Sequence, residues 1–163
     1  MLLLGAHVSI AGGIQKAPAI ASQLRINCMQ IFVKNQRQWR AAPLRKDQVT
    51  EWFNVLRYAK PKIEHIVAHS AYLINLASDY VETRRRSIDA LKGELRRCGQ
   101  LGIDRLVIHP GSHRGQGLLA GIALIVKGLD EVLSESENAV KILLETTAGS
   151  GNAIGSRFEE IAT

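Results

Sequence analysis

The sequence lacks several features that mark other classes of protein. It has two cysteines, Cys28 and Cys98, and no CxxC pair, which argues against both a disulfide framework and a zinc ribbon. No run approaches the roughly 18 apolar residues of a membrane span. The opening Leu2-Leu3-Leu4 is too short for the apolar region of a signal peptide and has no basic flank, so we expect a cytoplasmic protein.

The amino-acid composition is that of a folded domain with an excess of basic residues. Apolar residues make up 46% of the 163 residues and charged residues 22%, which excludes disorder as the main state. The net charge of +6 is uneven, because residues 1–100 carry 16 basic and 7 acidic side chains whereas residues 101–163 carry 5 and 8. A basic half suits a phosphate-rich partner, although charge alone fits a solvated surface at least as well.

Short apolar runs alternate with stretches of helical periodicity along the chain. Five runs predict strands, at residues 2–9, 28–33, 65–68, 105–108 and 141–144. Helices are predicted between them, at residues 14–24, 47–59, 79–102 and 117–133. A last helix begins near the end of the sequence, and three helices have an expected N-cap, namely Asp47, Asp79 and Ser156.

This order of elements predicts the fold. Strands that are apolar throughout and alternate with helices indicate a parallel sheet covered on both faces. The strand ends recur at intervals of 25 to 40 residues, which favours a βα barrel. An open doubly wound sheet is the alternative, but the GxGxxG loop that usually follows its first strand is absent. We therefore expect an α/β, TIM-type (β/α) barrel, with residues 1–163 forming a single domain that is an incomplete N-terminal portion, about five βα units of eight.

Metal-binding residue types stand at the ends of the predicted strands. The third strand ends in His69, the fourth in His109 and the fifth in Glu145. Because the carboxyl ends of barrel strands meet around one mouth, we expect these side chains to converge. Two imidazoles and a carboxylate suit zinc, whereas a single buried histidine is more often simply hydrogen-bonded. His7 ends the first strand and can join the same mouth.

Two loops on this mouth carry residues suited to nucleic acid. Residues 34–40 (KNQRQWR) follow the second strand and mix cations, amides and an aromatic ring, which suits contacts to phosphates and base edges. Residues 70–76 (SAYLINL) follow His69, and their Tyr72-Leu73 pair can act as a wedge between stacked bases. The alternatives are a polar surface loop and ordinary loop packing.

Together these segments form a combination more specific than any single histidine. They are Gly5-Ala6-His7-Val8-Ser9 with Gly12-Gly13, Lys34-Asn35-Gln36-Arg37-Gln38-Trp39, His69 with Tyr72-Leu73-Ile74-Asn75-Leu76, His109-Pro110-Gly111-Ser112-His113, and Glu145 with Thr147-Ala148-Gly149. The combination resembles endonuclease IV, the family of zinc-dependent endonucleases that cut DNA at abasic sites. The resemblance runs in order from the first strand to the last residue.

The resemblance implies a TIM-type barrel with up to three zinc ions that acts in base excision repair. By position, His69 and His109 would bind one zinc, and Glu145, the implied catalytic residue, would bridge it to a second. The implied reaction is hydrolysis of the phosphodiester 5′ to an abasic site in double-stranded DNA, leaving a 3′-hydroxyl. The chemistry agrees, because zinc activates water and a metal cluster stabilises both the attacking and the leaving oxygens.

The resemblance also assigns roles to the two loops. Arg37, Tyr72 and Leu73 would insert into the duplex at the lesion, with Gln38 beside them. An abasic sugar is easily turned out of the duplex because it has no base pair to break.

The sequence departs from the family pattern in three respects. Ser70 follows His69 where an acidic residue is frequent, which changes the groups available to support this histidine. Thr146 follows Glu145 where asparagine is common. The family draws its further Asp, His and Glu ligands from strands six to eight, which are not among the five predicted strands. Only the first metal site is therefore expected to be nearly complete.

Three hypotheses remain open at this point. The first is an abasic-site endonuclease of which the sequence is a partial product or gene fragment. The second is a metal-dependent sugar isomerase or epimerase of the same barrel type, which the loop residues Arg37, Tyr72 and Leu73 disfavour. The third is a truncated, inactive remnant that binds DNA through its basic half. In each case we expect no membrane partner, and exposed edges of the first and fifth strands that reduce stability or lead to dimerisation.

Overall fold

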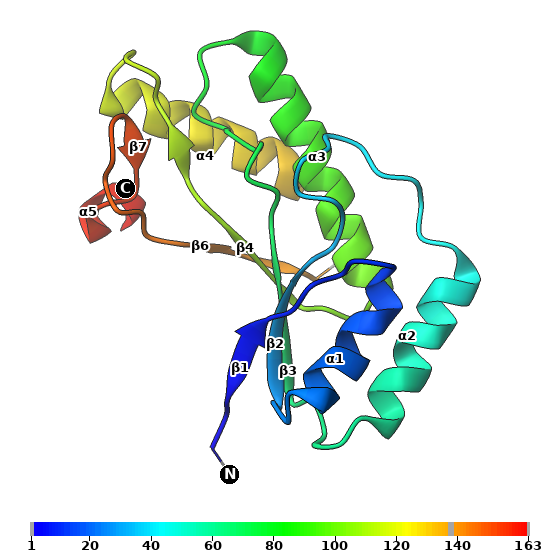
Figure 1. The fold of residues 1–163 in the computed structure, drawn as a ribbon. Coiled ribbons are helices and arrows are strands. Elements are labelled where there is room, and N and C mark those ends of the chain that lie inside the picture. The colour runs from blue at the N-terminus through cyan, green and yellow to red at the C-terminus, as the bar shows by residue number, and fades with distance from the viewer. Residues whose placement is uncertain (1, 137–138, 163) are drawn as a thin grey trace.

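The computed structural model describes residues 2–136 and 139–162, and its centre is a five-stranded parallel sheet (Figure 1). The strand order is β1-β2-β3-β4-β6, so the order of the strands in the sheet is also their order along the chain. The strands are β1 (Gly5–His7), β2 (Cys28–Phe32), β3 (His65–His69), β4 (Arg105–Ile108) and β6 (Lys141–Leu144). All five predicted strands are present, which confirms the α/β architecture.

Helices follow the strands in the predicted order. They are the 3-10 helix η1 (Ile14–Lys16) and the α-helices α1 (Ala17–Gln23), α2 (Lys46–Tyr58), α3 (Val81–Gln100), α4 (Leu118–Ser134) and α5 (Phe158–Ala162). The first predicted helix is divided into η1 and α1, with Pro18 in the first turn of α1, where a missing N–H costs nothing. No helix in residues 2–136 or 139–162 is both long enough and apolar enough to cross a bilayer.

Two of the predicted N-caps are wrong. Helix α2 is capped by Arg45, whose backbone N–H donates to the side chain of Gln48, while Asp47 lies in the first turn and pairs with the Arg45 guanidinium at 2.9 Å. Helix α3 begins after Tyr80 rather than Asp79. Because the Gln48 side chain accepts from the backbone N–H of Arg45, the Asp47 carboxylate can pair with the Arg45 guanidinium instead. Residue types alone do not show which of the two side chains takes part in capping.

One pair of strands was not predicted. Strands β5 (Gly111–Ser112) and β7 (Ala153–Ile154) form a two-stranded antiparallel ribbon, in which Gly111 pairs with Ile154 and Ser112 with Ala153. Two residues are too few to show a periodicity, so the pattern of apolar residues could not indicate them. The ribbon ties the segment after β4 to the segment after β6.

The sheet is covered unequally on its two faces. In β2 and β4 buried residues such as Met29, Ile31 and Leu106 alternate with half-buried ones, so the buried residues share one face of the sheet. Helices α1, α2 and α3 lie on one side of the sheet (Figure 1). The opposite face carries residues such as Gln30 and Leu143, which are half-buried and exposed. The expectation of a sheet buried on both faces is therefore wrong, because the described helices cover only one of them.

Helix α3 packs against the sheet with one continuous buried face. The buried residues recur at spacings of three and four, as expected for the inner side of an amphipathic helix, and are Ser87, Ile88, Ala90, Leu91, Glu94, Leu95 and Cys98. A carboxylate, that of Glu94, therefore occupies a position in this face that is otherwise apolar or small.

The sheet order places β1 and β6 at the two edges of the five-stranded sheet. An edge strand presents unpaired N–H and C=O groups that favour pairing with another chain. We expect the 163-residue chain to dimerise through these edges or to have a low thermal stability. Analytical ultracentrifugation and calorimetry measure both properties, and a monomer with a single cooperative transition would contradict the expectation.

Candidate metal centre

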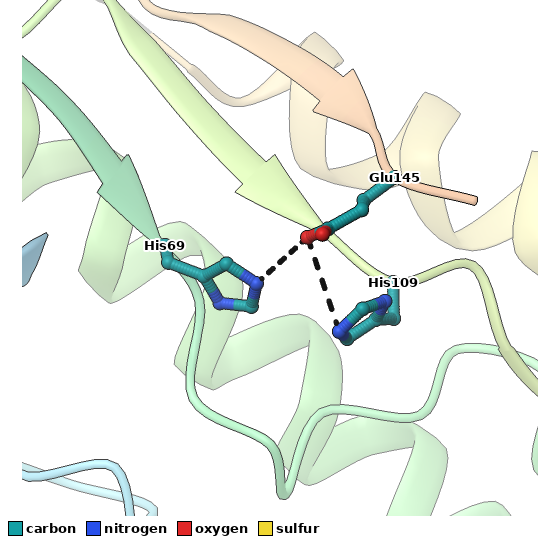
Figure 2. A group of neighbouring side chains, drawn as sticks. All are labelled: His69, His109 and Glu145. Carbon is teal, nitrogen blue, oxygen red and sulfur yellow. Dashed lines mark hydrogen bonds and ion pairs between the residues drawn. The ribbon is translucent and has the colours of Figure 1, made fainter. Parts of the chain in front are cut away.

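The three predicted metal ligands lie together at the carboxyl edge of the sheet (Figure 2). His69 is the last residue of β3, His109 follows the last residue of β4, and Glu145 follows the last residue of β6. These strands are neighbours and parallel, so their ends project the three side chains into one space. Residues separated by up to 76 positions in the sequence are thereby brought into contact.

The ligand atoms are spaced as a bound metal ion requires. Nε2 of His69 lies 3.0 Å from Oε2 of Glu145, and Nε2 of His109 lies 4.0 Å from the same oxygen. One ligand atom from each residue lies within 4.8 Å of the others. Zinc bonds of about 2.0–2.2 Å in tetrahedral geometry place ligand atoms roughly 3.4 Å apart, a value that the two distances bracket. The donor set of two imidazole nitrogens and one carboxylate oxygen fits a divalent ion.

A backbone contact orients His69 for this role. Nδ1 of His69 lies 2.8 Å from the carbonyl oxygen of Ser70, which can only accept a hydrogen bond, so Nδ1 carries the proton. In the neutral ring Nε2 then presents a lone pair to the Glu145 carboxylate. Two electron-rich atoms at 3.0 Å need a positive charge between them, either a proton or a metal ion. The Ser70 main chain thus gives the support that an acidic side chain is expected to give in the family.

His109 is held less firmly than His69. Its Nδ1 is buried and has no hydrogen-bond partner within the described part of the chain. The ring is instead placed by aromatic contacts, with its centroid 5.2 Å from that of His69 and 6.3 Å from that of Tyr72. Tyr72 and His109 are nearly parallel, with an interplanar angle of 19°.

His7 lies beside the three residues without joining them. Its ring centroid is 6.3 Å from that of His69 and 4.5 Å from that of Phe32, and its Nδ1 lies 3.0 Å from Oε1 of Gln30. Partial burial lowers the pKa of His7 more than the bond to Gln30 raises it, and nearby His69 lowers it further. His7 is therefore a neighbour of the centre, and it is not part of the ligand group found among the described residues.

Of the two loops predicted to contact DNA, the one at residues 70–76 lies beside the centre. Arg37 and Gln38 are exposed, Tyr72 is 64% exposed and Leu73 is half-buried. The Tyr72 ring lies 5.6 Å from the His69 ring, so the proposed wedge is next to the metal ligands. The structure thus brings the ligands and the residues 70–76 into one region of the surface.

The cations of residues 34–40 were predicted to contact a ligand, but Lys34 is buried. Its side chain is only 5% exposed, and its Nζ lies 3.1 Å from Oε1 of the buried Glu94. Burial raises the pKa of Glu94, and the positive charge of Lys34 opposes this rise. Sequence reasoning missed Glu94, although a carboxylate within the apolar stripe of a helix is a signal that could have identified it.

Asn75 belongs to the segment at residues 72–76, and the hydrogen bonds of its side chain were not predicted. Its Oδ1 accepts hydrogen bonds from the backbone N–H groups of Ser112 and Ala77 at 2.9 and 3.1 Å, and its Nδ2 donates to the Ser112 carbonyl at 3.0 Å. Gly111 has a φ of 126°, and a Cβ there would lie 2.5 Å from Oδ1 of Asn75. Glycine is thus required for the approach of these two loops.

Comparison with known proteins identifies the family. Residues 18–163 match the family model described as "Xylose isomerase-like TIM barrel". The chain is 44% identical over 159 residues to "Probable endonuclease 4" of Chloroflexus aurantiacus, covering 97% of this chain and 55% of that protein. It is 40% identical over 158 residues to the protein of the same name from Halothermothrix orenii, covering 97% and 56%. The chain thus spans about half the length of the curated relatives it matches.

Solved structures agree with the sequence comparison. The crystal structure of endonuclease IV from Thermus thermophilus matches with a TM-score of 0.80 and 32% identity, over 97% of this chain and 56% of that chain. A D-tagatose 3-epimerase-like protein matches with a TM-score of 0.73 at 15% identity, over 97% and 58%, which reflects the shared fold alone. Five parallel strands followed by helices are a partial TIM barrel. With this fold and these relatives, the chain belongs to the endonuclease IV family of xylose isomerase-like TIM barrels.

Proposed function

We propose that this chain carries the first metal site and the lesion-binding loops of a zinc-dependent DNA-repair endonuclease. The protein hydrolyses the phosphodiester 5′ to abasic sites in double-stranded DNA and leaves a 3′-hydroxyl, as a cytoplasmic enzyme of base excision repair. The observation that carries the proposal is the group His69, His109 and Glu145 with Tyr72 against it, since this places a metal site beside a candidate wedge for a duplex. The names of the relatives support it.

The chain's own residues have distinct roles in this proposal. His69 and His109 would hold zinc through their imidazoles, with the carboxylate of Glu145, whose Oε2 lies near both rings. A carboxylate has two oxygens, so Glu145 could also serve as the bridging, catalytic residue. Zinc, when bound, lowers the pKa of a water ligand and stabilises negative charge on a phosphate oxygen.

The loops recognise the damaged duplex in the same proposal. Arg37 is an exposed cation that can contact backbone phosphates, with the Gln38 side chain beside it. Tyr72 and Leu73 fill the space beside the abasic sugar, where a missing base leaves the stack open. An isomerase or epimerase of this barrel type has no need of an exposed wedge, so Tyr72 favours the endonuclease over that alternative.

An incision assay on a synthetic duplex tests the function. We expect the purified chain with zinc to cut the strand that contains an abasic site on its 5′ side, because the three ligands lie together and Tyr72 lies beside them. Chelation should abolish the cut, and an undamaged duplex of the same sequence should remain intact. Products are resolved on a denaturing gel. Absence of any cut by the chain would favour the inactive DNA-binding remnant.

Zinc titration tests the ligand set separately from activity. We expect His109→Ala or Glu145→Gln to weaken zinc binding at least about tenfold, since loss of even an outer support of a metal ligand costs that much. His65→Ala is the matched control, because His65 lies at the opposite end of the strand that His69 ends. Competition with a chromophoric chelator gives the affinities. Equal affinities for all four proteins would exclude this site.

The wedge is tested by binding to an abasic duplex. Stacking of a base on an aromatic side chain contributes about 1–3 kcal/mol, so we expect Tyr72→Ala to weaken binding by roughly fivefold to a hundredfold. Tyr58→Ala is the control, since Tyr58 is 76% exposed and ends α2, away from the metal centre. Fluorescence anisotropy with a labelled duplex measures both. An equal loss in the two variants, or none in either, would contradict the assignment.

A further inference from the structure

An ion pair buried under the two loops has no role in the reaction proposed above. Nζ of Lys34 lies 3.1 Å from Oε1 of Glu94, and the two side chains are 5% and 1% exposed. Removing two charges from water is costly, and an apolar pair of similar size is often at least as stable. Stability alone therefore does not explain why charges occupy these positions.

The pair connects the main chains of the two loops. Nζ of Lys34 also donates to the carbonyl oxygen of Gln38 at 2.6 Å. The backbone N–H of Ala71 donates to the Glu94 carboxylate, with both oxygens at 3.3 Å. A continuous path of polar contacts thus runs from Gln38 through Lys34 and Glu94 to Ala71. Its two ends lie directly beside Arg37 and Tyr72 in the sequence.

The helix that carries Glu94 holds the first loop at further points. Arg97, three residues later on α3, donates from Nε to the carbonyl oxygen of Val33 and from Nη1 to that of Ala42 at 2.9 Å. The loop is therefore attached to α3 before, within and after the residues 34–40. These three attachments leave it little freedom relative to the helix.

We propose that Lys34 and Glu94 are positioning residues that hold the two loops at a fixed distance, so that Arg37 and Tyr72 meet a damaged duplex together. The proposal rests on the function proposed above, because it concerns how the same loops bind abasic DNA. If the pair served only to stabilise the fold, its removal would lower the melting temperature, and the loops would become more mobile only as far as the whole fold is destabilised.

A double variant separates these two roles. Lys34→Met with Glu94→Gln removes both charges, while the amide oxygen introduced at position 94 would still accept from the N–H of Ala71, so this N–H keeps an acceptor. We expect a melting temperature close to that of the original chain, with faster amide hydrogen exchange in residues 34–40 and 70–76. Zinc affinity should be unchanged, and affinity for an abasic duplex should fall at least about tenfold.

A matched control removes a different ion pair from the same helix. Lys92 on α3 lies 3.0 Å from Glu131 on α4, so Lys92→Met with Glu131→Gln makes the same change of charge without removing a described hydrogen bond or ion pair to either loop. We expect this control to leave exchange in both loops and affinity for the abasic duplex at their original values. If the first double variant does not fold, Lys34→Met with Glu94→Leu replaces it as an apolar pair.

The exchange measurement decides the proposal even without DNA binding. If the folded double variant shows exchange in both loops equal to that of the original chain, or if the Lys92/Glu131 control changes the loops as much, Lys34 and Glu94 do not position them. If the original chain does not bind an abasic duplex, the proposed function fails, and the exchange comparison still tests whether the pair fixes the loops.

Discussion

Parallel pairing of β3, β4 and β6 is the constraint on which the candidate site depends. Parallel strands all end at the same edge of a sheet, so whatever residue follows each strand is delivered to one place. The pairing of Ile108 with Leu144 brings the next residues, His109 and Glu145, to the same level. A metal centre can then be assembled from three residues without any long side chain reaching across the fold.

Electrostatics determines what this arrangement can hold. His69 donates a hydrogen bond from Nδ1 to a backbone carbonyl and directs Nε2 at a carboxylate oxygen. The contact between Nε2 and the carboxylate oxygen is favourable only when a positive charge lies between them, so this arrangement attracts cations. The Lys34–Glu94 pair, by contrast, combines opposite charges and is bonded to backbone groups, which lets both charges be buried.

How much the sequence could predict depends on how local each signal is. Strands β4 and β6 have the predicted bounds, because in each of them three consecutive apolar residues stand between a cation and the polar residue that follows, so the strand can end in few places. His69, His109 and Glu145 could be identified since each stands at the end of such a run. The position of Glu94 within the apolar stripe of α3 indicates that it is buried, but its partner Lys34 is known only from the structure, and β5 and β7 form only because each pairs with the other. Such contacts are set by packing between distant segments, which no local pattern encodes.

The attachment of both loops to α3 has a consequence for the order of folding. The contact between Arg97 and Val33 joins residues 64 positions apart, so the first loop cannot take its final shape until α3 has formed and packed against the sheet. Contacts of long sequence separation carry a large loop-closure cost and form slowly. We therefore expect residues 34–40 to take their final shape after β2 has paired with β3, whose paired residues are 37 positions apart.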